Sequence, residues 1–155
     1  MRKFTVLLFC VMSAIGFYMP QARADFDAGV MAYANGDFDA AAREFFQLSE
    51  KGDMAGQYHM GLLYEEGQGV PKQFEDAVRC YTKAAKQGYV DAYFALGEIY
   101  LRQPGGKKDR VQAHYWLGLA KKHGHPRGDE EFQRNRKAMT PEQIELAEKA
   151  VGRAP

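Results

Sequence analysis

Residues 57–71 read QYHMGLLYEEGQGVP, and much of this stretch returns 36 residues later in the chain. Gly61 recurs as Gly97 and Tyr64 recurs as Tyr100, with no gap in the alignment. A shorter copy begins near Tyr33 once a five-residue deletion is allowed. A fixed period of about 20–50 residues is typical of repeat architectures, in which each unit stacks on the next. The sequence therefore predicts a chain of about three similar units.

Each unit is predicted to consist of two helices. In the middle unit the first helix is predicted to span about 54–66. A glycine-rich loop follows it and ends at a proline, a residue that cannot continue a helix. The second helix spans about 73–86 and ends at Gly88. Asp37 and Asp109 precede the second helix of the other units, where an aspartate caps free N–H groups. The pattern predicts an all-α fold, a short right-handed α-solenoid of about three helix-turn-helix repeats with a C-terminal capping helix.

Glycine and alanine positions form the predicted framework of the repeat. Glycine inside a helix costs about 1 kcal/mol relative to alanine, so we expect Gly61 and Gly97 to lie where a neighbouring helix approaches closely. Alanines of the second helices are expected to face these glycines, and two tyrosines are expected to act as large knobs. The framework positions are Gly61, Tyr64, Gly69, Ala77, Gly88, Gly97, Tyr100, Ala113, Trp116, Ala120 and Gly124.

The last stretch departs from the period. A very polar run at residues 127–137 is followed by a helix start, with Thr140 as the cap, Pro141 at the first helical position and Gln143 three residues beyond the cap. The apolar residues that follow form a narrow stripe. We expect residues 125–155 to form capping helices that cover the exposed end of the stack.

The stretch at residues 57–71, with the residues that follow it, closely resembles the Sel-one-like repeat, a relative of the tetratricopeptide repeat. The resemblance covers about residues 25–124, and the first unit, which lacks the long loop, looks more like a tetratricopeptide repeat. Cys80 stands where the family usually has the tryptophan that Trp116 keeps, and residues 103–106 replace the usual loop. The resemblance implies an adaptor, because exported bacterial members of the family mediate protein–protein contacts.

The N-terminus has the layout of a bacterial secretory signal peptide. Arg2 and Lys3 precede a largely apolar run at residues 4–18, and residues 22–24 supply a small-x-small pattern. The run is shorter than the roughly 20 residues that span a bilayer, so cleavage after Ala24 is favoured over a permanent anchor. The layout predicts a periplasmic or secreted protein with no stable membrane insertion after cleavage. The predicted divisions are a signal peptide at 1–24, a first helix pair at 25–52, two Sel-one-like repeats at 53–124 and the cap at 125–155.

Charge and cysteine content point to no specialised class. The net charge of +1 gives no argument for a nucleic-acid partner. The charge is unevenly distributed, because residues 25–106 hold 13 acidic and 7 basic residues, whereas residues 107–155 hold 7 acidic and 11 basic residues. Cys10 falls within the predicted signal peptide, so Cys80 has no partner for an internal disulfide. Because Cys80 lies on an apolar helical stripe, we expect its thiol to be buried. A disulfide between two chains is the alternative.

The motifs of common catalytic sites are missing. The chain has no His-Glu-x-x-His, Gly-x-Ser-x-Gly, phosphate-binding loop or Cys-x-x-Cys. Ser13 and Ser49 are its only serines, and neither has a lysine three residues later, as β-lactamases and penicillin-binding proteins require. We therefore predict no catalytic residue, no cofactor and no enzymatic activity. An envelope hydrolase or β-lactam-binding enzyme is the less favoured alternative.

The histidines and the basic residues of the chain define no closed binding site by their spacing. His123 and His125 lack an evident carboxylate or thiol partner, so they do not define a closed metal site and no metal is predicted. His59 is expected to be packed against its neighbours. A basic cluster is expected to be a solvated face, with an anionic partner as the alternative. The cluster consists of Lys107, Lys108, Arg110, Lys121, Lys122 and Arg127.

The favoured binding site is the concave surface, which the first helix of each unit lines in helix-pair solenoids. Aromatic residues with a few charges suit a protein or peptide partner. The alternative for the three apolar members is packing within the repeat. Because the groove is short, a weak homo-oligomer or a purely structural, self-associating protein also stays open. The predicted groove residues are Tyr58, Leu62, Glu65, Glu66, Phe94, Glu98 and Arg102.

Overall fold

The computed structural model describes residues 23–102 and 109–151, and the regular elements within these ranges are all helices. Most of the predicted signal peptide, at residues 1–22, lies outside the described residues. No helix in the described ranges is both long and apolar enough to cross a membrane. The helices are residues 23–34, α2 (Phe38–Glu50), α3 (Met54–Glu66), α4 (Phe74–Lys86), α5 (Val90–Leu101), α6 (Arg110–Lys122), α7 (Gly128–Lys137) and α8 (Pro141–Val151).

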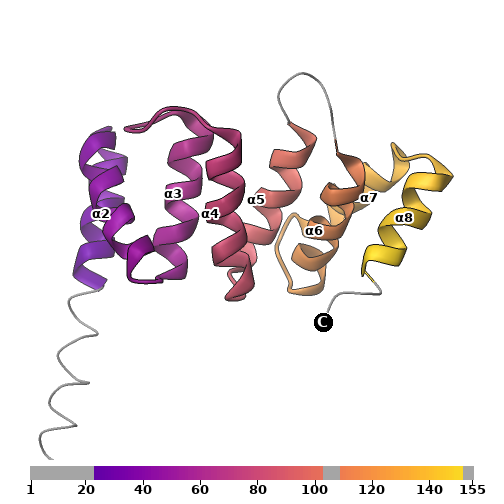
Figure 1. The fold of residues 1–155 in the computed structure, drawn as a ribbon. Helices are drawn as coiled ribbons and strands as arrows, with labels where there is room; N and C mark the ends of the chain where they lie inside the picture. Colours follow the sequence, from indigo (N-terminus) through magenta and orange to yellow (C-terminus); the bar gives the residue numbers. More distant parts are fainter. Residues whose placement is uncertain (1–22, 103–108, 152–155) are drawn as a thin grey trace, which may run out of the picture.

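The helices stand side by side in one row from the N-terminal to the C-terminal end (Figure 1). Each helix from α2 to α6 packs on the next one along the chain, and α8 packs back on α6. The all-α fold with sequential antiparallel packing confirms the predicted fold class. The groove described below is formed by α3, α4 and α5, together with the turn that follows α6.

Helix starts follow the predicted capping chemistry. The carboxylate of Asp37 accepts a hydrogen bond from the Ala40 N–H at 3.0 Å, and the Asp109 carboxylate accepts one from Gln112 at 2.9 Å. Thr140 and Gln143 exchange side-chain-to-backbone bonds of 3.0 and 3.3 Å, which is the reciprocal capping box. The middle unit has the bounds expected from its sequence, because α3 spans Met54–Glu66.

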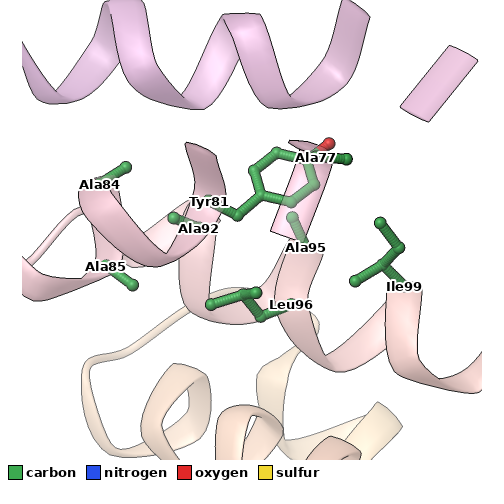
Figure 2. Close-up of a cluster of buried hydrophobic side chains, with 8 residues drawn as sticks. All are labelled: Ala77, Tyr81, Ala84, Ala85, Ala92, Ala95, Leu96 and Ile99. Carbon is green, nitrogen blue, oxygen red and sulfur yellow. The ribbon is translucent and has the colours of Figure 1, made fainter. Parts of the chain in front are cut away.

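The mid-helix glycines lie against large side chains of the second helix in their own unit. A Cβ on Gly61 would lie 2.5 Å from two ring carbons of Tyr81, and one on Gly97 would lie 2.5 Å from Leu117 Cγ. The alanines of α4 and the Tyr81 ring belong to one buried cluster, which residues of α5 in the next unit complete (Figure 2). Ala77 and Ala84 lie four residues before and three residues after Tyr81 in α4, so the alanines expected to face Gly61 share the face of the helix that carries the contacting ring. Small residues on α4 and α5 bring consecutive units together, and a missing side chain makes room for Tyr81 within a unit.

The polar run after the third unit forms α7, whose inward face is itself polar. Glu131 is 7% exposed and Asn135 is 1% exposed. Asn135 accepts a hydrogen bond from Arg110 Nη1 at 3.1 Å and donates one to the Arg110 carbonyl at 2.9 Å. Arg134 donates to Glu131 at 2.6 Å. Buried polar groups are tolerated when they are hydrogen-bonded, so α7 docks on α6 through the Asn135–Arg110 pair together with the Phe132 ring, which packs on a buried apolar cluster.

Candidate binding groove

The seven predicted groove residues come together in the structure. They line two adjoining cavities of about 850 and 350 Å³. Leu62, Glu65, Glu98 and Arg102 border both cavities, Glu66 borders the larger one, and the other two predicted residues border the smaller one. We call the surface lined by these two cavities the groove. The groove spans the second and third units, as expected from the sequence. Its role in binding stays a prediction.

The larger cavity has an apolar floor and a charged rim. Leu62, Phe74 and Ile99 supply the floor from α3, α4 and α5. Phe74 also lies edge-on to Tyr100, with 6.2 Å between the ring centroids. The rim consists of charged and amide side chains, namely Glu65, Glu66, Gln68, Lys72, Glu98 and Arg102.

A chain of ion pairs runs along the centre of the groove. Arg102 Nη2 lies 2.9 Å from Glu65 Oε1 and 3.4 Å from Glu98 Oε2, and so it bridges α3 and α5. The other oxygen of each glutamate is also engaged, because Tyr81 donates to Glu65 at 2.7 Å and Arg127 donates to Glu98 at 3.2 Å. The arginine side chains are more than half exposed, and such pairs contribute little to stability. Their effect is to fix the groove's shape and balance two of its carboxylates.

The aromatic members of the groove are largely occupied by packing. Phe94 is 7% exposed, because the His125 ring stacks on it at 4.0 Å and the Arg127 guanidinium lies 4.8 Å from its centroid. Tyr58 packs on Tyr81 and on a second tyrosine, with centroids 5.6 and 5.0 Å away. Burial and then nearby carboxylates raise the pKa of Tyr58 to about 12. The Phe94 ring therefore supports the wall of the groove instead of offering an open face.

Several groove residues were missed by the sequence analysis. Gln68, Lys72 and Phe74 enter from the loop and helix after α3, and Asp91 and His125 enter at the smaller cavity. Four of the five come from loops or from a second helix, and Asp91 lies in the first turn of α5, outside the inner-face positions that the 36-residue period identified.

Three of the described members of the predicted basic cluster are engaged by different partners. Arg127 points to Glu98, Arg110 bonds to Asn135, and Lys121 lies 2.6 Å from Asp129. Lys107 and Lys108 lie outside the described residues.

Comparison with known proteins agrees with the period in the sequence. A family model described as the Sel1 repeat matches residues 55–89 and 90–125, and these ranges contain α3–α4 and α5–α6. The chain is a Sel1 repeat protein. The crystal structure of a protective antigen present in uropathogenic Escherichia coli, described as displaying an SLR fold, superposes with a TM-score of 0.76 at 30% identity. The match covers 84% of this Sel1 repeat protein and 29% of the antigen.

The sequence relatives of this Sel1 repeat protein are longer than the chain. The DAP3-binding cell death enhancer 1 of Rattus norvegicus is 35% identical over 83 residues, which are 54% of this chain and 15% of the rat protein. The exopolysaccharide production negative regulator of Rhizobium leguminosarum bv. viciae is 22% identical over 151 residues, with 65% of this chain and 57% of that protein covered. A Sel1 repeat protein of Oxalobacter formigenes superposes with a TM-score of 0.55 at 28% identity, over 59% of this chain and 26% of its own.

The histidines of this Sel1 repeat protein pack against aromatic rings. His59 stacks on Phe45 with centroids 4.6 Å apart, and His114, 2% exposed, lies 4.3 Å from the Phe132 ring. Burial lowers the pKa of both imidazoles and of His125. Among the described residues no three histidine, cysteine or acidic side chains are grouped as a metal site would require. The structure thus gives these imidazoles a packing role as neutral rings.

Acidification is expected to destabilise the protein through these imidazoles. In the unfolded chain these three imidazoles have a pKa of about 6.5, and in the folded chain their pKa is lower. As the pH falls below about 6.5, the unfolded chain therefore binds more protons than the folded chain, and the free energy of unfolding decreases. Urea denaturation between about pH 7.5 and pH 5.5 measures the effect. His114→Phe keeps the ring contact with Phe132 and removes one titrating group, so its stability is expected to depend less on pH. An identical pH profile in the variant would contradict the role of His114.

Proposed function

We propose that this Sel1 repeat protein is an adaptor that holds a protein or peptide partner in the groove, and that it acts in the periplasm or outside the cell. The observation that carries the proposal is the convergence of Leu62, Glu65, Glu98 and Arg102, from two successive units, on both cavities. An extended surface with an apolar floor and a polar rim suits a polypeptide, whose side chains need both. The name of the rat relative describes a protein that binds another protein, which agrees with a binding role.

Leu62→Arg tests the groove directly. Leu62 borders both cavities, so a long cation there would obstruct the apolar floor of each. We expect the purified variant to capture about tenfold less of the partner from an envelope extract than the wild type does, as is usual when a central interface residue is replaced. Mass spectrometry of the captured proteins is the measurement.

Leu146→Arg is the matched control. Leu146 is 59% exposed on α8, so the same substitution there leaves the groove intact. The proposal requires that wild type and this control capture the same protein and that Leu62→Arg does not, with all three equally helical by circular dichroism. Equal capture by all three would reject the groove. Recovery of the unprocessed chain from the cytoplasm alone would reject the proposed location.

A further inference from the structure

A hydrogen-bond donor and an acceptor stand side by side on the wall of the smaller cavity. His125 Nε2 lies 3.6 Å from Asp91 Oδ1, which is longer than a hydrogen bond. The two residues come from different elements, the turn after α6 and the first turn of α5. Both border the smaller cavity, a hollow of about 350 Å³. The pair is therefore placed to bond to a third group that lies in the cavity.

The other ring nitrogen of His125 decides which nitrogen carries the proton. The Arg127 N–H donates to His125 Nδ1 at 3.2 Å, so Nδ1 is an acceptor and the neutral ring carries its proton on Nε2. Burial lowers the pKa of His125, which favours the neutral ring. The stack on Phe94, at 4.0 Å between the centroids, holds the plane of the ring. His125 thus presents an N–H on the side of Asp91.

Both groups have bonding capacity that the described residues leave unused. No lysine or arginine in that part of the chain lies within ion-pair distance of Asp91, whose side chain is 54% exposed. Among the same residues, the side-chain polar atoms that are both sealed from solvent and without a partner belong to Gln68, His114 and Trp116. His125 Nε2 is not one of them, so a group in the cavity can reach it.

The chemistry of the pair selects a neutral group that both donates and accepts. A carboxamide donates an N–H to the Asp91 carboxylate and accepts from His125 Nε2 through its carbonyl oxygen. An ammonium or guanidinium group has no acceptor for the His125 N–H, and a carboxylate has no donor for Asp91 and would meet its charge. The rest of the cavity adds no net charge, because Glu65 and Glu98 are paired with arginines.

The size of the cavity favours a carboxamide over a hydroxyl. A hydroxyl oxygen makes the same two bonds that one water molecule makes, so it gains little by displacing water. The cavity of about 350 Å³ far exceeds the roughly 30 Å³ that one water occupies, and it has room for a whole side chain. Leu62, Phe94 and Ala95 border it, and they provide apolar contacts for the methylene groups that carry the amide.

We propose that the smaller cavity binds the side-chain carboxamide of an asparagine or glutamine in a partner peptide, with the amide N–H on Asp91 and the carbonyl oxygen on His125 Nε2. This inference rests on the proposed function, because it names the partner chemistry of the same groove. Asp91 and His125 determine the specificity, and the Arg127 backbone N–H keeps the imidazole in its donating form.

A random peptide library displayed on phage, selected on the purified protein, supplies the probe. We expect the selected peptides to share an asparagine or glutamine. One of them, labelled with a fluorophore, is compared by anisotropy with two matched peptides, in which the corresponding acid or a lysine replaces the amide residue. Each replacement is expected to weaken binding about tenfold, as for the loss of a hydrogen bond to a charged group. Equal binding of the three peptides would overturn the inference.

Asp91→Asn is expected to remove or reverse the preference of the protein for the amide over the acid. The variant keeps the size of the side chain, removes its charge and offers an N–H, so a carboxylate then finds a donor on each side. The acidic peptide is expected to bind this variant at least as tightly as the amide peptide does, most clearly at low ionic strength. A loss of folding would weaken both peptides and would not reverse their order.

Asp39→Asn is the matched control. Asp39 lies in the first turn of α2, as Asp91 does in α5, and it borders neither cavity of the groove. This variant is expected to keep the preference of the wild type for the amide peptide. A preference for the amide that survives Asp91→Asn unchanged would refute the assignment of Asp91.

The failure of this inference differs from the failure of the proposed function. If selection yields peptides without an amide residue and Leu62→Arg no longer binds them, the groove is a binding site and the amide specificity is wrong. If the selected peptides bind Leu62→Arg as well as wild type, neither proposal stands. The two proposals are supported together by amide peptides that bind wild type and Leu146→Arg, fail on Leu62→Arg and lose their advantage over the acidic peptide on Asp91→Asn.

Discussion

Replacing Gly61 with alanine is expected to lower the free energy of unfolding by about 2–3 kcal/mol, as overpacking of a tight core does. The new Cβ would lie 2.5 Å from Cδ1 and Cε1 of Tyr81. The Tyr81 ring is fully buried among the alanines of α4 and α5, and its hydroxyl is tied to Glu65. Movement of the ring would therefore disturb this packing or break the hydrogen bond to Glu65. Urea denaturation followed by circular dichroism measures the loss.

Gly118→Ala is the matched control for this prediction. Gly118 also lies inside a helix, but a Cβ there would meet Phe132 at 3.4 Å, which is ordinary contact. Both variants gain the helix propensity of alanine, worth about 1 kcal/mol, so Gly118→Ala is expected to be neutral or slightly more stable than wild type. If the two variants were equally stable, the close approach of Tyr81 to α3 would be refuted.

Replacing Asn135 with alanine is expected to detach the C-terminal helices from the stack, at a cost of about 2–3 kcal/mol for a buried, doubly bonded amide. The substitution removes both hydrogen bonds between Asn135 and Arg110. Hydrogen exchange resolved by segment is the measurement, because α7 and α8 are expected to lose protection while α3 and α4 keep theirs.

Lys137→Ala serves as the control on the same helix. Lys137 is exposed at the end of α7, and surface substitutions of this kind change stability by within about 0.5 kcal/mol. Uniform loss of protection along the whole chain in Asn135→Ala would show that the cap and the repeats unfold as one unit, which is against this prediction.

The sequence predicted the repeat and its helix ends well, because these depend on local chemistry. The bounds of α3, the aspartate caps at the second helices and the Thr140–Gln143 box each follow from a few neighbouring residues. Burial of Cys80 also follows from its helical position, and its thiol is free and buried. Two aligned copies of the repeat were enough to show which residues share a helix face, and the seven groove residues were predicted on that basis.

The rest depended on contacts that a period does not contain. Phe94 is covered by His125 and Arg127, which come from the turn after the last repeat. The helix α7 has hardly any apolar stripe, because its buried residues are polar and satisfied by side chains such as Arg110 and Arg134. The contact of Gly61 with the Tyr81 ring was missed, because the space left by a glycine can be filled by a large ring as well as by a small side chain.

The turn at Gly88 has a consequence for how such a chain grows. Its φ is +87°, and a Cβ there would meet nothing within 4 Å, so the space beside this residue is open. Consecutive units meet through small side chains that repeat along the chain. A duplicated unit spliced at this junction would find the same neighbours on both sides, so gene-level duplication would lengthen the molecule and its recognition surface without a new fold.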